Sequence, residues 1–126
     1  MSSNRNGPIR VLSQAEIEAD LAAVSKELEI QTHFYADLAS AAATAEADFK
    51  ATFARAVVGM SANQSMKLTS AEKQARAEVI ATDDFRAWKL AEARRNATKE
   101  LLLSLRARLD ALRSLAANVR YQVGSF

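Results

Sequence analysis

An apolar stripe that alternates steps of four and three residues is the feature that most constrains the fold of this chain. It runs through Ile17, Leu21, Val24, Leu28, Gln31, Tyr35, Leu38, Ala42, Ala45, Phe49, Thr52 and Ala56. Such spacing lines one side of an α-helix and is typical of a heptad seam. Ser13 and Glu16 match an N-terminal capping box, and Gly59 suits a left-handed C-terminal cap. We therefore expect one long helix over residues 13–58.

The second half of the chain predicts a second long helical stretch. Residues 59–69 are small and polar and predict a loop, after which Thr69 and Glu72 match another capping box. No glycine or proline interrupts residues 70–123. The side chains of Thr82, Asp83 and Asp84 can compete with the backbone for its hydrogen bonds and so divide this stretch. We therefore expect one helix or two. A second seam follows, at Leu102, Leu105, Leu109, Leu112, Ala116, Val119 and Val123.

Together these patterns predict an all-α chain that forms a long antiparallel helical hairpin with coiled-coil-like seams. Residues 13–126 would be a single helical domain, and residues 1–12 a flexible leader. Two helices cannot close a core alone, because each leaves part of its apolar stripe in water. We therefore expect a homo-oligomer, a ring or a bundle, in which Gln31 could set the register.

The composition argues against an enzyme. The 126 residues include no cysteine and one histidine, His33, which leaves no thiol nucleophile and no multi-histidine metal site. Asp83 and Asp84 are adjacent, but neighbours on a helix point about 100° apart, so a helix cap is the preferred interpretation. We expect no metal and no cofactor. Without an apolar run of about 18 residues, we expect a cytoplasmic protein with no membrane partner, in the host cytoplasm if a phage encodes it.

Charge is divided unequally along the chain. Residues 13–58 carry eight acids and three bases, whereas residues 85–126 carry nine bases and three acids. Four bases of the second half lie seven residues apart: Lys99, Arg106, Arg113 and Arg120. A turn centred near Gln64 would bring Asp20 opposite Arg108, so these bases could fasten the two helices or neighbouring subunits. An anionic partner is the alternative.

A separate basic cluster favours nucleic acid. It consists of Arg86, Lys89, Arg94 and Arg95. The same turn would place it opposite residues 33–42, where Asp37 is the only acid. Unneutralised bases on a helix suit a phosphate backbone. Trp88 could stack on an unpaired base or belong to the core. Three further bases extend the patch: Lys50, Arg55 and Lys67.

The order of features resembles the UvsY-type recombination mediators of T-even-like phages over roughly residues 35–120. The residues that carry the resemblance are Met66-Lys67-Leu68-Thr69, Ala71, Lys73, Asp84, Trp88, Ala111-Leu112-Arg113-Ser114 and Arg120. The resemblance implies a small, helical, ring-forming protein that binds single-stranded DNA. It also implies a role in loading a RecA-type recombinase onto strands coated by single-strand-binding protein.

One departure concerns the segment before the glycine. The family has a lysine–arginine pair and tyrosines there, whereas this chain has Lys50 and Arg55 at a different spacing. The basic cluster and the resemblance together favour an oligomeric single-stranded-DNA-binding accessory protein of recombination or replication. The alternative is a structural scaffold or adaptor of a phage, whose charge stripes mediate self-assembly.

Overall fold

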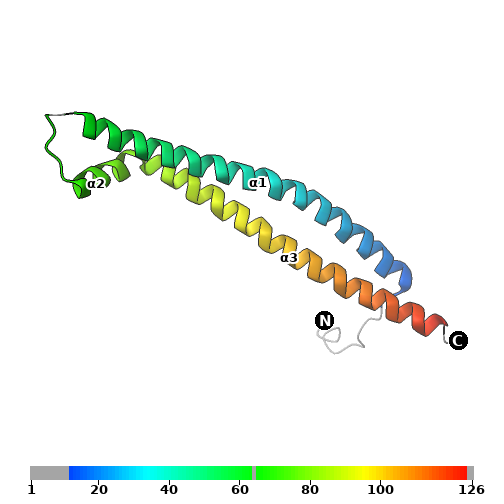
Figure 1. Cartoon of the computed structure of the whole chain (residues 1–126). Helices are drawn as coiled ribbons and strands as arrows, with labels where there is room; N and C mark the ends of the chain where they lie inside the picture. The colour runs from blue at the N-terminus through cyan, green and yellow to red at the C-terminus, as the bar shows by residue number, and fades with distance from the viewer. Residues whose placement is uncertain (1–11, 64, 125–126) are drawn as a thin grey trace, which may run out of the picture. The chain divides into compact units, whose positions relative to one another are not determined.

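The computed structural model is built of α-helices, as Figure 1 shows. It describes residues 12–63 and 65–124, with side chains to Tyr121. The helices are α1 (Gln14–Ala62), α2 (Ser70–Ile80) and α3 (Thr82–Gly124). Within these residues there is no β-strand, so the all-α expectation is confirmed. Apart from Leu12, the predicted flexible leader lies outside the described residues.

The start of α1 agrees with the sequence, but its end does not. The Ser13 hydroxyl accepts a hydrogen bond from the Glu16 amide at 3.2 Å, as predicted for the cap. The expected stop at Gly59 is wrong, because the helix continues to Ala62 and Gly59 has no positive φ. A Cβ added there would meet nothing within 4 Å, so neither backbone nor packing requires glycine. The next residue, Met60, is buried, and this extends the packed side of α1 by a turn.

The second stretch is divided, as the sequence allowed. Thr69 caps α2 by accepting a hydrogen bond from the Glu72 amide at 3.1 Å. The division falls at Ala81, whose φ and ψ are −91° and 10°. The Thr82 hydroxyl donates to the Glu78 carbonyl at 3.0 Å. Thr82 therefore bonds back to the end of α2, in competition with the backbone amides.

By its internal contacts the chain divides into two compact units. The first, here called the leucine unit, comprises residues 12–30 and 102–124 of the described chain. In it Val24 of α1 packs with Leu105, Leu109 and Leu112 of α3. Ile17 is fully buried. The core of this unit is therefore built from branched aliphatic side chains.

The second unit, here called the aromatic unit, comprises residues 31–101. Its α1 segment pairs with α3 through aromatic rings. A row spaced four and three residues along α3 is half-buried: Asp84, Trp88, Ala91, Arg95 and Thr98. This row includes two charged residues, so the core here is smaller and more polar than in the leucine unit.

Every residue of the predicted stripe on α1 is buried or half-buried. The stripe therefore marks the packed side of that helix. Coiled-coil packing, the homo-oligomer and the single domain over residues 13–126 stay predictions.

The register near Trp88 differs from the expected one. Trp88 packs on Phe49, and Asp84 binds Thr52, whereas a turn centred near Gln64 would set residues 86–95 against residues 33–42. The cause is the helix break at Ala81, since it prevents α2 and α3 from continuing one register along α1. Trp88 therefore lies near the α1 segment that contains Glu46 and Asp48, whereas Arg94 lines a groove with Phe34 and Leu38, within the expected residues 33–42.

Candidate nucleic-acid interface

Four aromatic rings form a cluster between α1 and α3 in the aromatic unit. Trp88 stacks on Phe49 with ring centroids 5.4 Å apart and an interplanar angle of 24°. Phe85 meets Trp88 edge-on at 5.9 Å and Phe49 at 5.5 Å. Phe53 lies 6.0 Å from Phe49. Trp88 is therefore engaged in packing, as the core interpretation of the sequence proposed, while remaining half-exposed.

A polar link lies beside the rings. The Thr52 hydroxyl on α1 donates to Asp84 Oδ2 on α3. The same hydroxyl accepts from Arg55 Nη2 at 3.5 Å. Arg55 is thus connected to the Asp84 carboxylate only through the Thr52 hydroxyl.

Lys89 extends the cluster to the surface. Its Nζ lies 4.2 Å from the centroid of the Trp88 ring and 5.6 Å from that of Phe85. It also forms an ion pair with Glu92 at 3.5 Å. Cation–π contacts at exposed sites contribute about 0.5–1 kcal/mol. Lys89 is exposed, so it offers a phosphate a positive charge that aromatic faces hold in place.

The other three bases of the predicted cluster point in different directions. Arg86 and Arg94 are exposed, and neither forms an ion pair with any described carboxylate. Arg95 is half-buried on the row that faces α1, and its guanidinium contacts Asn96 Oδ1 at 3.4 Å. Adjacent residues of a helix lie about 100° apart. The structure therefore separates Arg94 from Arg95 and leaves Arg86, Lys89 and Arg94 as the exposed bases of the cluster.

The secondary bases are scattered. Lys50 is bound by Glu46, four residues earlier on α1, at 3.0 Å. Lys67 lies exposed in the segment between α1 and α2. Lys50 is thus neutralised by its own helix, and Arg55 is linked through Thr52 to Asp84, two residues before Arg86.

The stripe from Lys99 to Arg120 is not fastened to α1 within the described residues. Arg113 pairs with Asp110 of its own helix, at 3.9 Å. The remaining bases of the stripe are exposed and form no ion pair with a described carboxylate: Lys99, Arg106, Arg108 and Arg120. The expected juxtaposition of Asp20 and Arg108 gives no ion pair. These charges are therefore open to a partner.

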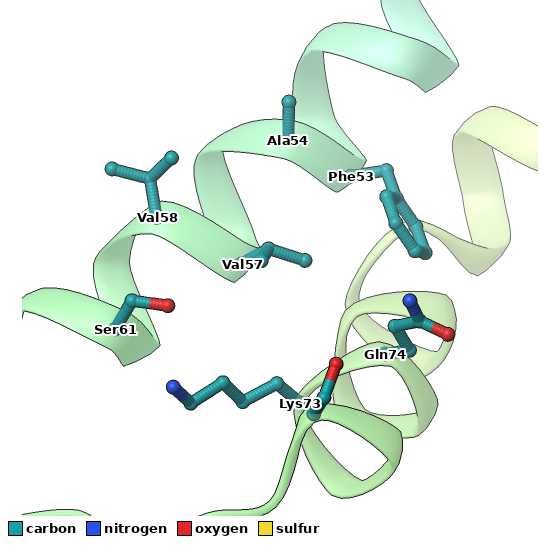
Figure 2. Close-up of a pocket in the computed structure, with 8 residues that line it drawn as sticks. Phe53, Ala54, Val57, Val58, Ser61, Lys73 and Gln74 are labelled. Atoms are coloured by element: carbon teal, nitrogen blue, oxygen red, sulfur yellow. The ribbon is translucent and has the colours of Figure 1, made fainter.

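Several grooves open on the aromatic unit. One, of about 460 Å³, lies between the end of α1 and α2 and is lined mainly by apolar side chains, among them Phe53, Val57 and Val58. Figure 2 shows Lys73 reaching from α2 into the space between the two helices. Another, of about 400 Å³, is lined by Gln31, Phe34, Leu38, Arg94, Ala97 and Thr98. Both are open surface features.

Neither the polar link nor the grooves follow from the sequence pattern. The sequence pattern favours a helix cap for Asp84 and predicts no partner for Thr52 on the packed stripe. The signal for the link was Thr52 itself, because a hydroxyl on a packed row requires a hydrogen-bonding partner. The grooves could not be found that way, since their positions depend on the register that the break at Ala81 sets.

The described residues contain no group of three or more metal-ligating side chains. Nor does any described helix combine the length and apolar character needed to cross a membrane. Comparison with protein-family models, curated proteins and solved structures gives no match.

Proposed function

We propose that this protein binds single-stranded DNA without sequence preference, as an oligomeric accessory factor of recombination or replication. The observation that carries this proposal is a set of exposed bases on α3 without a carboxylate partner among the described residues. In the aromatic unit these are Arg86, Arg94 and Lys99. Unneutralised bases favour phosphate, since binding releases condensed counterions.

Arg86 and Lys89 are the primary contacts in this proposal. Both are exposed. Arg86 forms no ion pair with a described carboxylate, whereas Lys89, held over the Trp88 ring at 4.2 Å, would exchange its surface ion pair with Glu92 for a phosphate. The half-exposed edge of the aromatic cluster beside them offers an apolar surface to an unpaired base. Arg94 and Arg95 complete the predicted cluster, and Lys50, Arg55 and Lys67 contribute to the longer-range field. The bound strand would need no metal or nucleotide from the protein.

The cellular process in this proposal is taken from the resemblance to UvsY-type mediators. Under this proposal the oligomer holds a DNA strand and helps to load a RecA-type recombinase where single-strand-binding protein is present. The exposed bases support the binding of the DNA strand. A recombinase and a single-strand-binding protein enter from the resemblance alone.

Charge reversal tests the site. We expect Arg86→Glu with Lys89→Glu to weaken binding of a fluorescein-labelled oligodeoxythymidine by more than about tenfold, because each lost phosphate contact weakens salt-dependent affinity. The matched control is Arg106→Glu with Arg113→Glu, which makes the same change of charge on α3 in the leucine unit. Fluorescence anisotropy at about 50 mM salt measures both. Equal losses in the two variants would overturn the assignment to Arg86 and Lys89.

A structural scaffold is the second candidate, favoured by the exposed apolar side chains. Val79 and Ile80 of α2 and Leu90 of α3 are all at least half exposed. Large exposed apolar groups that form a patch are typical of interaction surfaces, and Val79 and Ile80 line one groove together. If this candidate is right, the Arg106 and Arg113 reversals dissociate the oligomer. The wild type then has no affinity for DNA, so no variant lowers it.

A further inference from the structure

Helix α3 carries a second heptad-spaced row in the aromatic unit, distinct from the row that packs on α1. Its members are spaced three and four residues apart, and all are exposed: Ala87, Leu90, Arg94, Ala97 and Leu101. Leu90 is 54% exposed and Leu101 is 42% exposed. A helix with two such rows is suited to contact two neighbours, and one of them is covered by α1.

Helix α1 contributes to the same side of the aromatic unit. Phe34, which is 55% exposed, and the half-buried Leu38 line one groove together with Arg94 and Ala97. We call this surface the groove face and define it as Phe34, Leu38, Leu90, Arg94, Ala97 and Leu101. It combines large apolar side chains from two antiparallel helices, the arrangement that accepts a further helix.

The charges at the groove face are self-complementary. Asp37 follows Phe34 by three residues and so lies on the same side of α1. Asp37 and Arg94 are both exposed, and neither forms an ion pair with another described residue. A two-fold interface makes each contact twice, residue i with j and j with i. If α1 of one copy lies over α3 of the other, Asp37 meets Arg94 at two symmetric places.

We infer that the groove face binds the groove face of a second copy of this chain. An unrelated partner would need to match both the apolar rows and the two opposite charges, whereas a second copy supplies them by symmetry. The inference rests on the oligomer in the proposed function and names its surface. It also assigns Arg94 to the contact between copies and leaves Arg86 and Lys89 to the DNA.

The test is the molar mass of the full-length chain by light scattering after size exclusion. We expect the wild type to have at least twice the mass of one chain. Leu90→Glu is expected to weaken self-association by about tenfold or more, because a buried charge replaces a central apolar contact. The control is Val79→Glu on α2, where a 75% exposed valine lies outside the groove face. Far-UV circular dichroism verifies that both variants remain helical.

A charge swap separates pairing from folding. Arg94→Asp is expected to weaken association, and adding Asp37→Arg to it is expected to restore the wild-type mass. Any of four results would overturn the groove-face interface. The wild type is monomeric, Leu90→Glu leaves the mass unchanged, only Val79→Glu dissociates the oligomer, or the charge swap fails to restore association. Oligodeoxythymidine binding is measured on the same samples. If a monomeric chain still binds the oligonucleotide, the interface is refuted and DNA binding is not. If an intact oligomer does not bind it, DNA binding is refuted and the interface is not.

Discussion

The leucine unit and the aromatic unit use the same two long helices but fill their cores differently. In the leucine unit, Leu105, Leu109 and Leu112 are buried against Val24. In the aromatic unit the corresponding row of α3 is half-buried and includes Asp84 and Arg95. Stability should therefore be concentrated in the leucine unit. Apolar grooves and partly covered rings, which are features that recruit partners, lie in the aromatic unit, whereas exposed bases without a carboxylate partner occur on α3 in both units.

This difference has a physical basis in side-chain chemistry. Buried aliphatic side chains contribute about 25 cal/mol per Å² of apolar surface removed from water. For a fully buried leucine this amounts to about 1.5–3 kcal/mol. A hydrogen-bonded polar pair contributes less, about 0.5–1.5 kcal/mol. With Asp84 and Arg95 on its packed row, the aromatic unit gives up part of this apolar burial.

The largest effect is expected from truncating the leucine core. Leu109 is 6% exposed, so Leu109→Ala should lower the free energy of unfolding by about 2–4 kcal/mol through lost burial and a cavity. Urea denaturation followed by circular dichroism at 222 nm measures it. The matched control is Leu103→Ala, an exposed leucine of the same unit, for which we expect less than about 0.5 kcal/mol. Similar losses in both would show that the leucine core does not hold this unit.

The next effect concerns the aromatic cluster. Trp88→Ala removes the stacking on Phe49 and the edge contact with Phe85. Because Trp88 is half-exposed, we expect a loss of about 1–3 kcal/mol, below that of a fully buried aromatic. Val79→Ala, at a 75% exposed position of the same unit outside the groove face, serves as control. A loss larger than that of Leu109→Ala would reverse the comparison between the two units.

The sequence predicted the packed sides of the helices well and the site less well. The stripe from Ile17 to Ala56 recurs as the packed side of α1, because helical periodicity alone decides which residues share a side. The end of α1 was misplaced, since the burial of Met60 outweighs the turn preference of Gly59. The register of Trp88 on Phe49 depends on how the chain bends at Ala81, and spacing in the sequence carries no measure of that bend.

The polar link should have a smaller effect than either core. Thr52→Val keeps the shape of the side chain but removes the hydroxyl that donates to Asp84. We expect a loss of about 1–2 kcal/mol, because a carboxylate loses a partner at a half-buried position. A double-mutant cycle with Asp84→Ala gives the coupling energy of the pair. A coupling near zero would show that the link contributes nothing to the aromatic unit.

Capping of α2 should give the smallest effect of the series. Thr69→Ala removes the acceptor of the Glu72 amide, so we expect a loss of about 1 kcal/mol. Thr69→Ser, which retains the hydroxyl, is the control. The only tryptophan, Trp88, belongs to the same unit as α2. Its fluorescence therefore follows the aromatic unit while circular dichroism follows the whole chain, and divergence of the two curves would show that the units unfold separately.

Salt dependence of oligodeoxythymidine binding tests the central claim most directly. For the wild type, the logarithm of the association constant should fall linearly with the logarithm of the salt concentration, by about 0.7 for each phosphate contact. Arg86→Gln with Lys89→Gln should reduce that slope by about 1.4, the share of two contacts. No binding at about 50 mM salt, or an affinity indifferent to salt in the wild type, would contradict the proposed function.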